Sequence, residues 1–275
     1  MFFFYLRYIQ KLFKVHKITV GNNFGSKIII KSYRSAKSID IFFPEYNYTV
    51  TNREYKEFKK GIIKCPYEKR LCEIGYMGEG KYKSKGKDGK KTKAYNEWCH
   101  IIRRCYDPYC INDDRRLSYV DCFVCEEWHC FQNFAEWFYK NYYEVIGQKM
   151  HLDKDILVKG NKIYSPKNCI FVPERINTLF IKATKSRGKY PIGVYEFLDK
   201  RNGNRKLRAQ CSILKDEKVK REYLGDFPID RPFQAFITYK NFKENYIKQV
   251  ADEYKDLIPQ KLYEAMYNYD VEIND

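Results

Sequence analysis

The sequence has no hydrophobic run of the roughly 18 uncharged residues that a membrane-spanning helix requires. Its most apolar stretch, residues 1–20, is interrupted by four cations: Arg7, Lys11, Lys14 and Lys17. The same stretch lacks the small-residue cleavage site of a secretory signal peptide. We therefore expect a cytoplasmic protein with no membrane partner. A basic amphipathic segment at residues 1–17 that lies on a membrane surface is the other interpretation of this stretch.

Acidic residues are scarce relative to basic ones, because 35 Asp and Glu face 52 Lys and Arg, which gives a net charge of +17. A chain of 275 residues can bury a hydrophobic core, so wholesale disorder is excluded. The 26 Tyr and 19 Phe are interleaved with cations, a pattern that suits nucleic acid, where cations neutralise phosphates and rings stack. Composition therefore predicts a folded protein that binds nucleic acid.

The order of patterns along the chain predicts an α+β protein. Short β-type runs with turn residues between them occupy residues 17–73 and indicate a small antiparallel sheet or barrel. The Gly- and Lys-rich residues 78–93 have almost no apolar side chains, so we expect a mobile basic linker, either solvated or lying along a phosphate backbone. Apolar residues at helical spacing predict helices over 94–106 and 126–141. No internal repeat of fixed period is found.

A strand–turn–strand–helix pattern follows, and a sheet closes the chain. Residues 151–157 and 165–173 are strand-like, Gly160 marks a turn, and Pro173 opens a helix over 173–182. Three strands, at 193–198, 207–214 and 221–227, precede a long amphipathic helix from Arg231. The expected parts are an N-terminal β domain, a basic linker, a central domain with the ββα unit, a short linker and a C-terminal domain: 1–77, 78–93, 94–182, 183–189 and 190–275.

The segment LDKDILVKGNKIYSPKNCIFVPERIN, residues 152–177, resembles the finger of HNH (His-Me finger) endonucleases, particularly phage-encoded members. The aromatic and cysteine pattern of residues 98–137 is similar to the helices that precede the finger in those proteins. The resemblance implies that Asp153 and Asn177 bind one Mg²⁺ or Mn²⁺, and that Asn168, in the second strand, braces the loop by hydrogen bonds. Oxygen donors suit these hard cations.

This sequence departs from the family at the general base, because Lys154 stands where the family has its His. A lysine acts as a base only if burial or nearby cations pull its pKa far below about 10.4. His151 is the other candidate, since residues two apart on a strand share a face and His151 is two before Asp153. A finger that binds DNA without cutting it is the third interpretation. Arg175 is a candidate for holding a flanking phosphate.

Ten cysteines in a reducing compartment favour metal ligands or buried thiols over disulfides. Cys122 and Cys125 have the spacing of half a zinc knuckle, and a structural Zn²⁺ would take four thiolates. The predicted set is Cys105, Cys122, Cys125 and Cys169, with Cys110 or Cys130 as replacements for Cys122. Burial as small hydrophobic side chains is the alternative.

Residues 193–195 (GVY), 208–210 (RAQ) and 223–227 (YLGDF), followed by a helix with Ala235 and Tyr239, resemble the APETALA/ethylene-response-factor DNA-binding domain. That resemblance implies a three-stranded sheet in the DNA major groove, where strand side chains contact bases and phosphates. Leu207 stands near the place of the family's usual Trp. The candidate DNA-binding residues are Tyr195, Arg201, Arg205, Arg208, Gln210, Lys220 and Arg221.

The expected function is a sequence-targeted, homing or nicking DNA endonuclease, monomeric or homodimeric, in which one finger cuts one strand. A non-catalytic DNA-binding phage regulator, with the finger as a scaffold, is the main alternative. The third interpretation is a protein that binds and inhibits a host defence factor. A DNA affinity that falls steeply with salt, as phosphate contacts cause, would separate the first two interpretations from this one.

Overall fold

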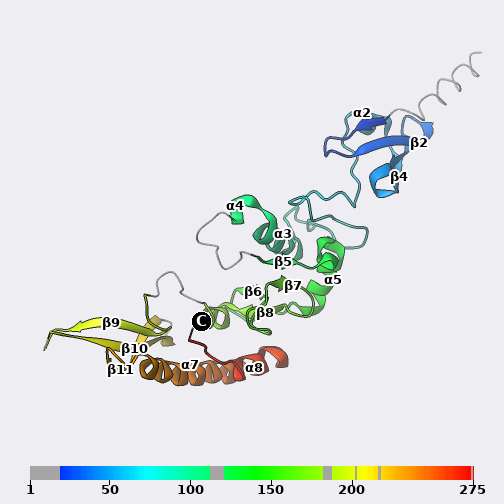
Figure 1. Cartoon of the computed structure of the whole chain (residues 1–275). Helices are drawn as coiled ribbons and strands as arrows, with labels where there is room; N and C mark the ends of the chain where they lie inside the picture. The colour runs from blue at the N-terminus through cyan, green and yellow to red at the C-terminus, as the bar shows by residue number, and fades with distance from the viewer. Residues whose placement is uncertain (1–18, 112–120, 182–187, 202, 216–217, 274) are drawn as a thin grey trace, which may run out of the picture. The chain divides into compact units, whose positions relative to one another are not determined.

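The protein is an α+β structure built from several small, mostly antiparallel sheets and helices, as expected (Figure 1). The structure is a computed structural model, and it describes residues 19–111, 121–181, 188–201, 203–215, 218–273 and 275. The segment at residues 1–17 that we considered as a membrane-surface helix lies outside the described residues. Among the helices of those ranges, none is long and apolar enough to cross a bilayer. The chain forms two compact units, Met1–Lys140 with Lys162–Ser165, and Asn141–Asn161 with Pro166–Asp275.

The first unit begins with the predicted antiparallel sheet, in which strands that are consecutive in sequence are also neighbours. Alternation places Ile39, Ile41 and Phe43 on the buried side of one strand, and Phe58 of a short helix joins the same core. The elements are β1 (Thr19–Gly21), β2 (Lys27–Ser35), β3 (Ser38–Phe43), the 3₁₀ helix η1 (Pro44–Tyr46), β4 (Tyr48–Arg53) and α2 (Tyr55–Lys59).

Residues 78–93 form a turn, a bridge and hydrogen bonds that the prediction of a mobile linker did not include. The backbone N–H of Gly86 donates to the carbonyl of Lys90 at 2.8 Å, and Lys85 and Lys91 form an antiparallel bridge. The side chain of Gln132 accepts from the N–H of Tyr82 at 3.0 Å and donates to its carbonyl at 2.9 Å. These contacts are hydrogen bonds rather than apolar packing, which is why composition did not indicate them. The mobility of the segment stays a prediction.

A helical region follows in the first unit: α3 (Lys93–Tyr106), α4 (Pro108–Ile111), β5 (Phe123–Val124), η3 (Glu126–His129), α5 (Phe131–Asn141) and β7 (Ile163–Tyr164). Helix α3 buries Trp98, Ile101 and Ile102, as its periodicity predicted. The single helix expected over 126–141 is instead broken at Cys130. Residue 130 is extended because the backbone on either side of it, at residues 129 and 131, pairs with Tyr76.

The second unit contains the predicted strand–strand–helix arrangement, which we call the finger: β6 (Met150–Asp153), β8 (Ile170–Pro173) and α6 (Glu174–Leu179). The strands are antiparallel, and helix α6 packs against both. Asn168 lies in the turn before β8 and not in the strand where we expected it, since pairing of β8 begins at Ile170 opposite Asp153. Pro173 is the residue that precedes the first turn of α6.

The second unit also contains the predicted three strands packed on a helix: β9 (Val194–Asp199), β10 (Asn204–Lys215), β11 (Lys218–Pro228) and α7 (Pro232–Tyr254), followed by α8 (Gln260–Tyr267), which we did not predict. Strand β10 is central in the sheet. Its buried residues Leu207, Ala209 and Cys211 alternate along the strand and join the core beneath α7. Leu207, which replaces the Trp expected from the resemblance of this sheet to a DNA-binding domain, is therefore a core residue.

The finger and the C-terminal sheet share one hydrophobic core. Val172 and Ile176 of the finger belong to the same cluster as Leu207 of β10 and Ile247 of α7, and all four are fully buried. Lys159, in the loop after β6, also donates to the carboxylate of Asp275 at 2.7 Å. The expected boundary at residues 183–189 therefore does not separate two cores, because so small a finger cannot enclose one alone.

Candidate active site and nucleic-acid interface

Asp153 ends strand β6 with its carboxylate held by the backbone. Its Oδ1 accepts the N–H of Asp155 at 2.9 Å and that of Ile156 at 2.7 Å. Burial raises the pKa of the Asp153 carboxyl above its ordinary value, and the nearby charge of Asp155 raises it further. With Oδ1 held by the two N–H groups, Oδ2 is the oxygen that a cation would use.

Asn177, the other predicted ligand, lies half-buried on α6, the helix that packs against β6. The pair offers one carboxylate and one amide oxygen, a donor set that fits Mg²⁺ or Mn²⁺. Within the described ranges, no group of three or more His, Cys, Asp or Glu side chains is placed to hold a metal. A cation at the finger would therefore keep water or phosphate oxygens as its remaining ligands, as Mg²⁺ commonly does.

The two candidate bases are placed differently. Lys154 is only 6% exposed and its Nζ lies 3.6 Å from the carboxylate of Asp155, which is the arrangement of an ion pair. His151 lies on the same face of β6 as Asp153, and its Nε2 is 3.9 Å from Oε1 of Glu174. A paired ammonium cannot accept a proton from water, whereas an imidazole beside a carboxylate can. The geometry therefore favours His151.

Asn168 stands where it can brace the loop between the finger strands. Its Nδ2 donates to Oδ1 of Asn161 at 2.9 Å, and Nδ2 of Asn161 donates to the carbonyl of Lys154 at 2.7 Å. This chain of hydrogen bonds fixes the backbone that follows Asp153. The bracing role expected for Asn168 matches this geometry.

Arg175 does not point freely toward a phosphate. Its Nη2 lies 2.5 Å from a carboxylate oxygen of Glu253 on α7, and its guanidinium lies 5.6 Å from the centre of the Tyr254 ring. These contacts join α6 to α7. The guanidinium of Arg175 is thus paired within the second unit, and its role in holding a flanking phosphate stays a prediction.

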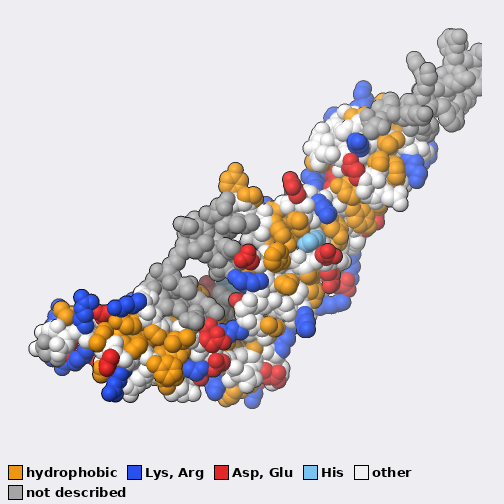
Figure 2. Space-filling view, in the orientation of Figure 1, with side chains coloured by type: hydrophobic (Ala, Val, Ile, Leu, Met, Phe, Trp, Pro, Cys, Tyr) orange, Lys and Arg blue, Asp and Glu red, His pale blue; other side chains and the backbone are white. Residues whose placement is uncertain are grey.

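The candidate DNA-binding residues divide between the two faces of the β9–β11 sheet. Four of them face away from the buried side: Tyr195, Arg208, Gln210 and Arg221. Arg205 and Lys220 pair with residues on the helix-facing side and are exposed at its rim, and Arg201 lies in the turn after β9. Figure 2 shows Lys and Arg side chains around the outer end of this sheet, with hydrophobic side chains among them.

Arg208 lies at the centre of a cluster on the outer face of the sheet. It forms two hydrogen bonds with the carboxylate of Asp226, at 2.6 and 2.9 Å, and these raise the pKa of Arg208. Its guanidinium lies 4.1 Å from the ring centre of Phe197 and 5.1 Å from that of Tyr223. Arg208 is therefore held rigidly, with an orientation set before any ligand arrives.

Sequence reasoning missed the partners of Arg208. Phe197 could have been found, because it is two residues after Tyr195 and shares its face. Asp226 could not, since the pairing of β10 with β11 shifts by one residue between Ala209 and Gln210. Sequence alternation cannot locate such a bulge. Arg205 and Arg201 are also paired, with Glu196 and Asp199 respectively.

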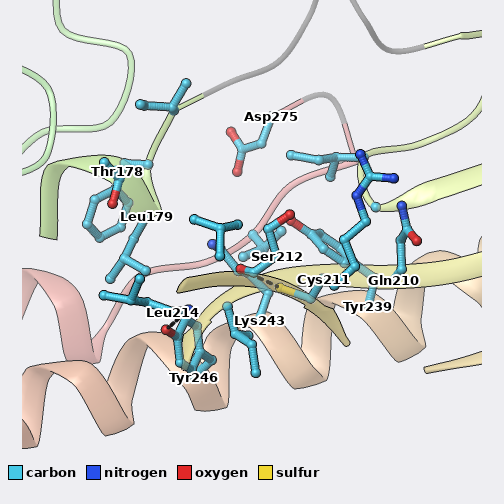
Figure 3. Close-up of a pocket in the computed structure, with 18 of the residues that line it drawn as sticks. Thr178, Leu179, Gln210, Cys211, Ser212, Leu214, Tyr239, Lys243, Tyr246 and Asp275 are labelled. Atoms are coloured by element: carbon cyan, nitrogen blue, oxygen red, sulfur yellow. Dashed lines mark hydrogen bonds between the residues drawn. The ribbon is translucent and has the colours of Figure 1, made fainter. Parts of the chain in front are cut away.

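A cleft of about 840 Å³ opens between α6, the sheet, α7 and the C-terminal residues (Figure 3). Tyr195, Gln210 and Arg221 line it from the sheet, and Arg175 lines it from α6. Lys243 of α7 is a lining residue that sequence reasoning missed, and burial lowers its pKa. The described lining does not include Asp153, Asn177, His151 or Lys154. The cleft thus gathers three candidate DNA-binding residues and Arg175, and not the candidate metal ligands or the two candidate bases.

The predicted zinc ligands are mostly buried. Cys105, Cys122 and Cys169 are buried, and Cys125 is half-buried at the residue before η3. The first compact unit contains Cys105, Cys122 and Cys125, whereas Cys169 belongs to the second. The described residues hold no cluster of three potential ligands, so the zinc site stays a prediction.

Comparisons with protein-family profiles, with curated proteins and with solved structures each found no match to this chain. The two resemblances drawn from the sequence are therefore carried by the residues quoted for them, and the functions they imply are proposals.

Proposed function

We propose that this protein is a DNA endonuclease that hydrolyses a phosphodiester at the finger, using one divalent cation, and that binds duplex DNA through the β9–β11 sheet. One observation carries the proposal. The Asp153 carboxylate is fixed at the end of β6, beside the helix that bears Asn177, and His151 shares its face of the strand. Metal-assisted hydrolysis requires such oxygen ligands and a nearby base.

Each residue of the finger has a distinct part in the proposed reaction. Asp153 and Asn177 would hold Mg²⁺ or Mn²⁺, which polarises the scissile phosphate and stabilises the leaving 3′-oxygen. His151 takes a proton from the attacking water on a ring nitrogen, and Glu174, 3.9 Å away, stabilises the imidazolium that results. The water oxygen bonds to phosphorus as the P–O3′ bond breaks. A single finger performs this once, so one chain nicks one strand.

The sheet would supply binding. Tyr195, Gln210 and Arg221 share its outer face and the cleft, where amide and guanidinium groups suit base edges and phosphates. Arg208, oriented by Asp226 and two rings, suits a bidentate contact to guanine or phosphate. In homing and nicking enzymes one chain both finds and cuts its site. Here the sheet would find the site and the finger would cut it.

A non-catalytic DNA-binding protein is the second candidate, and one observation favours it. Lys154 replaces the family's His and is buried in an ion pair with Asp155, so the position nearest the ligand offers no base. In that case the finger contributes to the core it shares with the sheet and does not cut.

A nicking assay separates the two candidates. Supercoiled plasmid is incubated with full-length protein and Mg²⁺ or Mn²⁺, and the variants are Asp153→Asn, Asn177→Ala, His151→Gln and Lys154→Gln. The endonuclease proposal expects open-circular product from wild type and Lys154→Gln. It expects a loss of at least about 100-fold for His151→Gln, the usual range for a base, and a loss of cleavage in the two ligand variants. DNA binding by wild type with intact plasmid, on many sequences and with both metals, would instead support the scaffold.

A further inference from the structure

The Lys-rich hairpin at residues 83–91, with sequence KSKGKDGKK, is a charged surface that the proposed function leaves unused. Five of its nine residues are lysines, and all five side chains are exposed: Lys83, Lys85, Lys87, Lys90 and Lys91. Within the described residues, none of these lysines forms an ion pair. The only acid in the hairpin is Asp88, whose Oδ1 accepts the N–H of Lys90 at 3.0 Å.

The hairpin is fixed at both ends. Thr92 donates its N–H to the carbonyl of Ser84 at 3.0 Å, and the Thr92 side chain accepts the N–H of Tyr95 at the start of α3. At the other end, the side chain of Gln132 holds the backbone of Tyr82 through two hydrogen bonds. The hydrogen bonds hold this backbone before any ligand binds. Binding therefore does not have to order it, and the entropic cost that weakens binding by flexible loops is avoided.

The side chains of the hairpin restrict the polyanion it can bind. It has no aromatic ring, so it cannot stack on the bases of a single strand. The adjacent Tyr82 is stacked on Tyr139, with ring centres 5.3 Å apart. The hairpin also has no apolar side chain to insert into a bilayer. Charge without stacking or insertion suits a duplex, whose bases are covered and whose phosphates are exposed.

We propose that hairpin 83–91 is a second contact for duplex DNA, one that binds phosphates and reads no bases. The inference rests on the proposed function, since it assigns the same duplex as partner. It adds that sequence-independent affinity comes from the first compact unit, while residues that can read bases belong to the sheet of the second. The hairpin supplies salt-dependent attraction, and the sheet supplies discrimination between sequences.

The test measures how duplex affinity of the full-length protein depends on salt. Fluorescence anisotropy with a labelled mixed-sequence duplex gives the slope of log K against log[KCl] from about 50 to about 200 mM. The test variant carries Lys85→Gln, Lys87→Gln and Lys90→Gln. The control carries Lys37→Gln, Lys59→Gln and Lys60→Gln, three exposed lysines of the N-terminal sheet domain, so both lose the same charge. Thermal melting checks that both variants are folded.

Each phosphate contact contributes a slope of about −0.9, so the hairpin variant should lose up to about 2.7 of slope. Over a fourfold change in salt, that loss corresponds to a difference of roughly 40-fold in affinity. The control should stay near wild type. Equal slopes for wild type and the hairpin variant, or equal losses in both variants, would overturn the inference. The inference would also be overturned if the hairpin variant kept its affinity for duplex DNA and lost affinity only for single-stranded RNA or for phosphatidylserine-containing vesicles.

The same measurements keep the two proposals apart. If wild type binds duplex and nicks plasmid while the hairpin variant is unchanged, the hairpin inference alone fails. If wild type binds no duplex at any salt concentration, the proposed function fails and takes the hairpin inference with it.

Discussion

Replacing Leu207 by alanine should destabilise the finger as much as it destabilises the sheet. Leu207 is fully buried on β10 and belongs to the cluster that contains Val172 of β8 and Ile176 of α6. A buried Leu→Ala change costs about 2–5 kcal/mol, because it removes apolar contacts and leaves a cavity. If one core supports both elements, that whole cost reaches the β6–β8 pair, even though β10 is not hydrogen-bonded to it.

Native-state hydrogen exchange measures this cost residue by residue. With a factor of ten for every 1.4 kcal/mol, the protection of the amides in the β6–β8 pair should fall by about 30- to about 4,000-fold. Phe43→Ala, in the separate core of the N-terminal sheet, should leave those amides unchanged. Unchanged protection of the finger amides in Leu207→Ala, with reduced protection in β9–β11, would refute the shared core.

Two further predictions concern the β9–β11 sheet. Gly193→Ala should cost more than about 1 kcal/mol in urea unfolding, because its φ is +77° and a Cβ would lie 2.1 Å from the ring of Tyr239. Gly160 has nearly the same φ, +78°, but a Cβ there would have nothing within 4 Å, so Gly160→Ala is the control for backbone strain alone. The difference between the two losses of unfolding free energy measures the clash with Tyr239, and equal losses would show that there is no clash. Glu196 has its pKa lowered to about 2, chiefly by the hydrogen bond from Arg205, so its stabilising effect is present above its ordinary pKa and is lost as pH falls from about 4 to about 2. Arg205→Gln should move that loss to higher pH in a circular dichroism titration, and an unaltered titration would disprove the assignment.

Local periodicity predicted the elements whose form is set within one segment. Alternation in 38–43 and 207–214 placed two strands correctly, and helical spacing placed α3. The order of the finger elements also followed from turn residues and proline. In each of these segments, burial of one face decides the structure, and the sequence records which face that is.

Elements fixed by distant partners could not be predicted. The hairpin at 83–91 depends on Gln132, and the break in the helix at Cys130 depends on Tyr76. Within the site, the choice between His151 and Lys154 needed the positions of Glu174 and Asp155. Most of these contacts join residues that are far apart in the sequence, so no local pattern reveals that they are close. Lys154 and Asp155 are adjacent in the sequence, but the sequence does not give the directions of their side chains.

The core shared by the finger and the sheet bears on how a chain with the proposed function could change its target during evolution. Proteins that recombine whole modules can exchange one binding domain for another and keep the cutting domain intact. Here an exchanged sheet would have to bring side chains that fit around Val172 and Ile176, or the finger would lose the surface on which it packs. This packing therefore favours inheritance of the finger and the sheet together, with changes of sequence confined to the outer face of the sheet.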